Sequence, residues 1–441
     1  MIAKMAPRAL LAAAFLAPVP GVAGAPEKFL EETFAVHAQF TYVEQETSRF
    51  HAPYAGPNSL SPGRGAETTD ATLYLGARLW PGAEGWINGE VDQGFGLNNT
   101  LGAAGFPSGE AYKVGKNQPY LRLPRSYLRQ TFNLDDTREA AEASAVQLGG
   151  SRSANRVVIT VGKLSVGDIF DTNQFAHDPR SDFFNWAVID AGTFDYAADA
   201  WGYTTGAAVE WYQGAWTLRA GLFDLSTVPN SARLDLGFHQ FQSLLELENR
   251  HEIATLPGRI SLTVFDSRGR MGLLDDAVQL AERSGNAVDI AAVRRYRGRA
   301  GASLNVEQQL AADLGMFARI GKAGGNVEPY EFTDIDWTAS TGLSLRGTRW
   351  HRADDTLGVA AIHNGISATR ERFLNAGGLG VLVGDGRLPH PGPEQIIETY
   401  YSLGVFRGTH LSVDYQWIDH PAYNRDRGPA SVIAVRLHAQ F

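Results

Sequence analysis

Apolar and polar residues alternate along most of the chain, and the last eleven residues show this most clearly. One face of this segment carries Ile433, Val435, Leu437, Ala439 and Phe441, and the other carries Val432, Ala434, Arg436, His438 and Gln440. Alternation with period two predicts a β-strand. An apolar face opposite a face that becomes polar is typical of a strand between lipid and water. A soluble sandwich strand shows the same alternation, so the interpretation depends on how often the pattern recurs.

The pattern recurs often enough to predict sixteen strands. They cover residues 34–42, 71–79, 85–93, 119–134, 155–163, 200–211, 214–224, 239–250, 259–267, 298–309, 312–321, 334–347, 355–363, 396–406, 410–418 and 430–441. These segments are long enough to cross a bilayer at a tilt, which takes roughly 9–11 residues. We therefore predict an all-β fold, a single transmembrane antiparallel β-barrel of about 16 strands within residues 26–441.

The lengths of the connections alternate as well. The short ones are residues 81–84, 212–213, 255–258, 310–311 and 407–409, and the long ones are residues 44–68, 94–118, 164–199, 225–238, 268–297, 322–333, 364–395 and 419–429. Short turns on one side and long loops on the other are typical of an outer-membrane barrel. We expect the long loops outside the cell and both termini in the periplasm. One short-side connection, residues 135–154, is long and helix-like in sequence.

The tryptophans fall near the predicted strand ends. Trp80, Trp86, Trp211, Trp216 and Trp350 lie at the short-turn side, and Trp201, Trp337 and Trp417 lie at the long-loop side. Aromatic belts at both interfaces are a membrane feature. The alternative is that these rings pack at the strand ends of a soluble core.

The first 25 residues read as a secretory signal peptide. Lys4 and Arg8 precede an apolar run, residues 9–17, and the small residues 23–25 suit cleavage. Together with the barrel pattern, this predicts the cell outer membrane, with its lipids and the barrel-assembly machinery as partners. The net charge of −9 argues against nucleic acid as a partner. The chain has no cysteine, so disulfides and thiolate sites are excluded.

The predicted lumen faces carry groups that bond to hydroxyls. Candidate channel-lining residues on the strands are Trp86, Asn88, Glu90, Asp92, Arg125, Tyr127, Arg129, Glu398 and Tyr400. Carboxylates and guanidinium groups make paired hydrogen bonds, and aromatic rings cover the apolar face of a sugar. This favours small carbohydrates as ligands. The alternative is a hydrated lining without specific ligands.

Two of these strands are expected to lie side by side. Residues 85–93 and 119–134 are consecutive and should pair antiparallel. That pairing would place Asn88, Glu90 and Asp92 beside Arg125, Tyr127 and Arg129. We expect this strip of acids facing bases to determine selectivity.

The long connection at residues 164–199 is rich in aspartate. It contains Asp168, Asp171, Asp178, Asp182, Asp190 and Asp195, with Phe184 and Trp186 among them. One interpretation is a loop that folds into the barrel and narrows it, with its carboxylates as ligands of a Ca²⁺ ion. The other is a solvated acidic loop. We include Phe184 and Trp186 among the candidate channel-lining residues and assign no metal ligand and no cofactor.

Enzymatic chemistry has little support in the sequence. Glu90 and Asp92 could be imagined as a glycosidase pair, but most polar barrels offer such pairs. No Gly-x-Ser-x-Gly motif is present. We therefore predict a protein that is not an enzyme, with an adhesin or binding barrel, and then a barrel-embedded hydrolase, as alternatives to a channel.

Several segments together resemble the carbohydrate-selective outer-membrane porins of the OprB family. They include Asp168-x-Phe170-Asp171-x-Asn173, Ala198-Asp199-x-Trp201-Gly202-Tyr203, residues 331–336, Glu398-x-Tyr400-Tyr401, and Pro421-x-Tyr423-Asn424-x-Asp426-Arg427-Gly428-Pro429. The resemblance covers nearly all of the chain after the signal peptide. It implies a sixteen-stranded barrel that admits monosaccharides and related sugars by facilitated diffusion.

Overall fold

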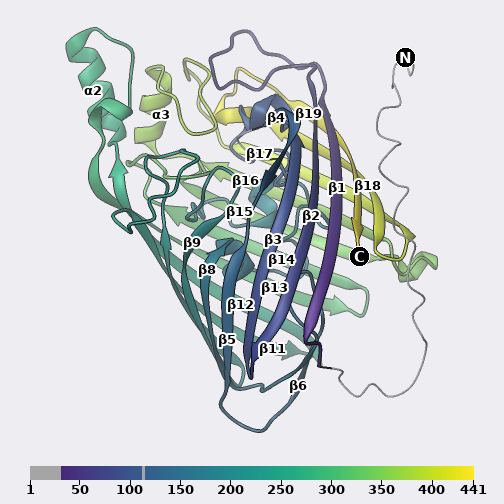
Figure 1. Ribbon diagram of the computed structural model, residues 1–441. Coiled ribbons are helices and arrows are strands. Elements are labelled where there is room, and N and C mark those ends of the chain that lie inside the picture. Colours follow the sequence, from purple (N-terminus) through teal and green to yellow (C-terminus); the bar gives the residue numbers. More distant parts are fainter. Residues whose placement is uncertain (1–30, 112–114) are drawn as a thin grey trace.

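The computed structural model describes residues 31–111 and 115–441, and these form a closed antiparallel barrel (Figure 1). The wall strands are β1 (Phe34–Thr47), β2 (Gly65–Trp80), β3 (Ala83–Gly94), β4 (Lys116–Arg122), β5 (Ser126–Asn133), β8 (Arg156–Leu164), β9 (Thr204–Gln213), β10 (Trp216–Asp224), β11 (Phe241–Ile253), β12 (Leu256–Met271), β13 (Arg295–Ala311), β14 (Leu314–Ala323), β15 (Trp337–Arg346), β16 (Thr356–Gly365), β17 (Glu394–Phe406), β18 (Thr409–Asp419) and β19 (Ala430–Gln440). The predicted signal peptide, residues 1–25, lies outside the described residues.

The barrel closes where the first strand meets the last. β1 pairs with β2 on one side and with β19 on the other. The backbone of Phe441 extends this pairing, because its N–H donates to Ala38 O at 2.8 Å and its carbonyl accepts from Ala38 N at 3.0 Å. The two faces of β19 agree with the sequence, since Ile433 and Leu437 are exposed outward while Arg436 is buried.

The wall contains sixteen strands if β4 and β5 are counted together, because both pair with β3, one after the other. The prediction of one continuous strand over residues 119–134 was wrong in this respect. The strand breaks at residues 123–125, where Pro124 has no N–H to donate. The break reverses the alternation upstream of it. Leu121 and Leu123 point outward, 76% and 47% exposed, and Arg122 points into the barrel.

The alternation of connection lengths is confirmed. Five of the short turns leave only two residues between paired strands, whereas the loop between β8 and β9, residues 165–203, is among the longest. The helix-like interpretation of residues 135–154 was wrong. This segment contains the paired strands β6 (Glu139–Ala141) and β7 (Gly150–Arg152). The helix-like pattern is too short to form a stable helix without packing partners. It also ends at Gly149 and Gly150, because glycine is unfavourable inside a helix.

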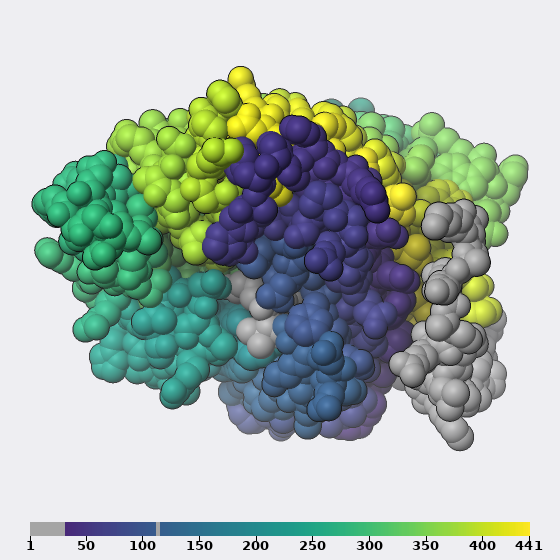
Figure 2. Space-filling model, turned by 90° about the horizontal axis from the view of Figure 1, so that it is seen from above, coloured from purple at the N-terminus to yellow at the C-terminus, as the bar shows by residue number. Residues whose placement is uncertain are grey.

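Within the part of the chain that the structure describes, three α-helices lie in the long loops. They are α1 (Trp186–Ile189), α2 (Leu274–Ser284) and α3 (Ala368–Asn375), of which α2 and α3 contact each other above the barrel wall (Figure 1). Figure 2 shows this end of the molecule, where the long loops gather over the mouth. Within residues 31–111 and 115–441, no helix is long and apolar enough to cross a membrane.

Outward-facing aromatic residues lie where the sequence places most of them. Trp80, Trp211 and Trp216, at the short-turn side, and Trp337, at the long-loop side, are 37–52% exposed. Trp86 differs, because it is buried and packs against the ring of His37 at 6.2 Å. It therefore belongs to the interior of the barrel and not to the belt.

Candidate functional site: the constriction of the barrel

The loop at residues 165–203 folds into the barrel and is attached to its far wall. Arg436, on β19, donates to the carbonyl oxygens of Pro179 at 2.6 Å and of Ser181 and Asp182 at 3.0 Å. Glu398, on β17, accepts the backbone N–H of Phe184 and of Asn185. A loop inside a barrel must have its peptide groups bonded, because water cannot reach all of them. These two strand residues meet part of that need.

Arginines on other strands hold the same loop. Arg319, on β14, donates to Val188 O at 2.6 Å and to Ala176 O at 2.9 Å. Arg299, on β13, pairs with Asp195 at 3.1 Å. The loop is thus fixed around much of the barrel circumference, as one of the two interpretations of its sequence expected.

The aspartates of the loop contact protein donors. Asp195 also accepts the backbone N–H groups of residues 330–332, and Asp171 accepts that of Ala191. Among the described parts of the chain, no group of three or more histidine, aspartate or glutamate side chains is arranged to hold a metal ion.

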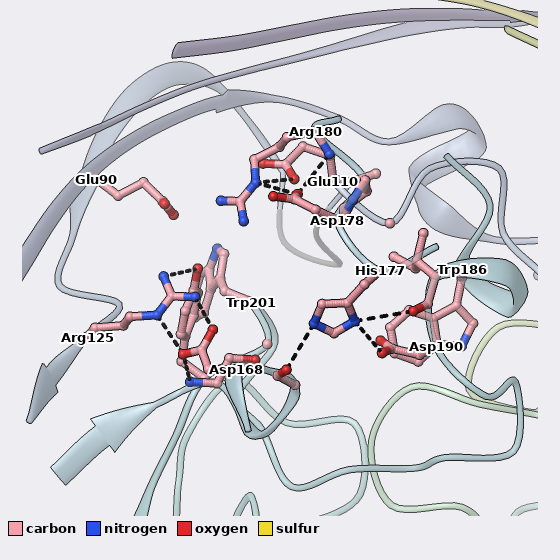
Figure 3. Close-up of a pocket in the computed structure, with 18 of the residues that line it drawn as sticks. Glu90, Glu110, Arg125, Asp168, His177, Asp178, Arg180, Trp186, Asp190 and Trp201 are labelled. Atoms are coloured by element: carbon pink, nitrogen blue, oxygen red, sulfur yellow. Dashed lines mark hydrogen bonds and ion pairs between the residues drawn. The ribbon is translucent and has the colours of Figure 1, made fainter. Parts of the chain in front are cut away.

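A cavity of ≈ 480 Å³ lies between this loop and the wall formed by β2 to β5 (Figure 3). The wall contributes Glu90, Asp92, Arg122 and Arg125, and the segment at residues 95–111 contributes Glu110. The inward loop contributes Asp168, His177, Asp178, Arg180, Trp186, Asp190, Trp201 and Tyr203. Four of the candidate residues, Glu90, Asp92, Arg125 and Trp186, line this cavity.

Local structure fixes two loop residues of the cavity. Asp168 ends the 3-10 turn Val166–Asp168, and its carboxylate accepts the N–H of Ser165 at 3.2 Å in a capping box. Trp186 begins α1, whose N-cap residue Asn185 accepts the N–H of Ala187. The indole of Trp186 stacks on the ring of Phe106 at 5.2 Å, so the segment at residues 95–111 supports it.

The strip of opposite charges forms with a different arginine from the one expected. Arg122 pairs with both Glu90 and Asp92, and the strand pairing sets Glu90 opposite Arg122. Arg125 instead makes two hydrogen bonds to Asp168, Nε to Oδ2 at 2.7 Å and Nη2 to Oδ1 at 2.6 Å. The expected pairing of Glu90 and Asp92 with Arg125 and Arg129 was therefore wrong, because the break at Pro124 shifts the inward positions.

Aromatic rings lie against these arginines. The Arg122 guanidinium lies 5.1 Å from the Trp201 ring, and that of Arg125 lies 5.0 Å from the Tyr203 ring. Trp201 lies in a turn directly before β9. Asp199 forms this turn, because its carboxylate accepts the N–H groups of Trp201 at 2.9 Å and of Tyr203 at 3.2 Å. The predicted strand at residues 200–211 accordingly begins only at Thr204.

On the opposite side of the cavity, Arg180 lies beside two carboxylates. Its Nε donates to Asp178 Oδ1 at 2.8 Å, and Glu110 lies 3.9 Å away. Burial opposes ionisation of Asp178, but the Arg180 guanidinium holds the pKa of that carboxyl below its usual range. The lining carries six acidic residues and three arginines, so the cavity is acidic on balance.

The remaining candidates lie outside this cavity. Asn88 is fully buried in the wall, and Trp86 donates to Glu84 at 3.2 Å. Tyr127 and Arg129 do not line the cavity, but both bond to the carbonyl oxygen of Val146, which does. Three others lie where the loop meets the far wall. Phe184 lies under the Arg436 guanidinium at 4.2 Å, Tyr400 contacts the Phe183 ring at 4.9 Å, and Glu398 binds the loop backbone as described.

Sequence reasoning missed Arg122, Arg180, Trp201 and Tyr203 as lining residues. Trp201 and Tyr203 stand in one of the segments that carry the family resemblance, so that signal was available. Arg122 could have been found from Pro124, because a proline inside a predicted strand indicates a break or a bulge.

The family model for the carbohydrate-selective porins, OprB family, matches residues 58–441. The high-pH structure of OprB from Pseudomonas putida has a TM-score of 0.69 with this chain at 16% identity, covering 93% of this chain and 94% of that one. The low-pH structure of the same protein has a TM-score of 0.50 at 13% identity, covering 93% of each chain. None of the curated proteins matches the sequence.

Proposed function

The chain belongs to the carbohydrate-selective porins of the OprB family, and we propose that it conducts monosaccharides by facilitated diffusion through the constriction beside the inward loop. It is an outer-membrane β-barrel porin for small carbohydrates.

The observation that carries this proposal is the composition of the ≈ 480 Å³ cavity. Its volume lies within the range of about 300–1,000 Å³ that is usual for small-ligand sites. Arg122, Arg125 and Arg180 bring donors into it, Glu90 and Asp178 bring acceptors, and Trp201 brings an aromatic face. A neutral polyhydroxylated ring can use all three kinds of contact.

The ion pairs make the binding weak, as transport requires. Arg122 is paired with Glu90 and Asp92, and Arg125 with Asp168, so these groups offer a passing hydroxyl only their remaining donors and acceptors. Hydrogen bonds of this kind contribute about 0.5–1.5 kcal/mol each. A solute that makes a few of them enters and leaves again, whereas tight binding would block the channel.

Liposome swelling tests this proposal. Liposomes containing the purified chain are diluted into glucose, a disaccharide, or a salt of similar size, with empty liposomes as the control. The proposal expects faster swelling with glucose than with the disaccharide. Equal rates for both sugars would contradict monosaccharide selectivity. No entry of any solute would favour a plugged adhesin, and turnover of a glycoside or sugar ester would favour a hydrolase.

A further inference from the structure

The tip of the hairpin between β5 and β8 enters the lumen from the short-turn side. This tip, residues 144–147, is closed by backbone hydrogen bonds between Ser144 and Gln147 at 3.0 and 3.2 Å. Ser144, Ala145 and Val146 line the same cavity as the inward loop. Figure 1 shows the hairpin at the short-turn end of the barrel, opposite the long loops.

The tip is attached to two separate places on the wall. On β5, Val146 O accepts from Arg129 Nη1 at 3.0 Å and from the Tyr127 hydroxyl at 3.3 Å. On β1, the ring of His37 lies with Nδ1 3.4 Å from Ala145 O. Tyr127 is the next inward residue below Arg125, so the tip lies one pair of residues, about 7 Å along the strand, beneath the Arg125–Asp168 ion pair.

The base of the hairpin is held as well. Glu32 N donates to Gly149 O at 3.0 Å, and the Glu32 carboxylate accepts Gly149 N at 2.7 Å. Leu148 is 1% exposed. The contacts with Glu32 and the burial of Leu148 therefore hold the base of the hairpin in place.

The hairpin separates two cavities that share one residue. Ser144, Ala145 and Val146 line the constriction cavity, while Gln147 and Leu148 line a second cavity of ≈ 660 Å³ that Arg129 and Arg156 also line. Asp168 lines both. The two cavities meet at Asp168, so a solute can move from the first to the second between Asp168 and the hairpin tip.

We propose that the tip at residues 144–147 is a second, periplasmic constriction that limits the size of the solute leaving the channel. The inward loop narrows the lumen from the outer side, and the hairpin narrows it directly below. The Ser144 side chain is exposed to the cavity at this point. The Ser144 hydroxyl and the amides of Gln39 and Gln440, paired on β1 and β19, offer neutral partners to sugar hydroxyls there.

The absence of cysteine from the chain makes a direct test possible, since a single introduced thiol is unique. The Ser144→Cys variant is reconstituted in a planar bilayer and treated with a bulky, membrane-impermeant thiol reagent. We expect a fall in ion current of roughly twofold or more, because the label narrows the path. Glucose is expected to slow the labelling. The matched control is Ala140→Cys, on the exposed part of the same hairpin, where labelling should leave the current unchanged.

A second variant tests size selection. Replacement of residues 142–149 by a two-residue turn keeps the β6–β7 pairing and removes the tip. We expect a larger conductance and a swelling rate with disaccharide that approaches the rate with glucose. Complete labelling of Ser144→Cys without a change in current, or an unchanged sugar ratio in a folded shortened variant, would overturn the inference. If the shortened variant does not fold, the labelling result decides.

The inference on size selection depends on the proposed function, but the two fail differently. If the unmodified chain gives no glucose swelling, the proposed function is wrong. The fall in ion current on labelling Ser144→Cys would still locate the constriction at the hairpin.

Discussion

Arg125 and Asp168 form two hydrogen bonds of 2.7 and 2.6 Å, and these join the wall of the barrel to the start of its inward loop. Arg125 lies directly after Pro124, where the wall strand breaks, and its carbonyl accepts Asn88 N at 3.0 Å. The break thus lets the Arg125 side chain point into the barrel, where it contacts the inward loop. The Arg125–Asp168 pair is one of several contacts that hold the inward loop against the wall.

Loss of the Arg125 side-chain charge should destabilise the loop. In Arg125→Gln, Asp168 loses its partner while its side chain is only 20% exposed. Removing one member of a buried pair costs about 3–5 kcal/mol, and we expect somewhat less here because Asp168 keeps some contact with water. Heat resistance of the folded band on gels measures the effect. Adding Asp168→Asn should restore part of the stability. Arg78→Gln is the control, since its partner Glu31 is 53% exposed and 3.8 Å away.

Trp201 should contribute to sugar recognition without supporting the barrel. Trp201→Ala removes the aromatic face beside Arg122, so glucose should block the ion current several-fold less well, while Trp201→Phe should retain part of the block. Current block in a planar bilayer measures both. Trp211→Ala, on the membrane-facing side, is the control. Equal block by glucose in all three variants would remove Trp201 from the site.

Asp190 should make the stability of the loop depend on pH. Burial raises the pKa of Asp190 to about 6, with His177 opposing the rise and Asp171 supporting it. In the unfolded chain an aspartate titrates near pH 3.9. Between these values the unfolded state releases the proton and the folded state keeps it, so this contribution is full below about pH 4 and is lost as the pH rises through 6.

The Asp190→Asn variant tests this sign. It should be more stable than the parent chain at pH 7 and should lose that advantage at pH 4, as measured by heat resistance at each pH. An advantage that is constant with pH would show that the carboxyl does not titrate in this range.

Phe441 should matter for insertion. Its side chain is 57% exposed on the membrane face, and its backbone closes the barrel against Ala38. If the barrel-assembly machinery recognises this last strand, Phe441→Asp should lower the amount of folded protein in the outer membrane far more than Gln440→Asn. Equal amounts for the two variants would remove this role from the terminal aromatic residue.

The barrel could be predicted from the sequence for two reasons. The alternation of apolar and polar residues follows from a wall between lipid and water, and the alternation of short and long connections follows from the two sides of a membrane. Ile433 and Leu437 face outward as their period predicts. The site was harder to predict, because it depends on an irregularity. The break at Pro124 makes Arg122, and not Arg125 or Arg129, the base beside Glu90 and Asp92.

The inward loop shows the same limit. Its aromatic and acidic residues indicated that it could fold into the lumen, but not which of them would face the channel. Glu398 and Phe184 are of residue types that suit a sugar-binding site, yet the structure places them where the loop attaches to the wall. Period and composition alone do not distinguish a loop anchor from a lining residue.

The most direct test of the account is glucose titration of the ion current through single channels of the purified chain, compared with Arg122→Ala. We expect a reversible, concentration-dependent block by glucose in the parent chain. In Arg122→Ala the block should be weaker and the preference for cations greater, because Glu90 and Asp92 lose their partner. A parent channel whose current does not respond to glucose, or an Arg122→Ala channel with an unchanged block, would contradict it.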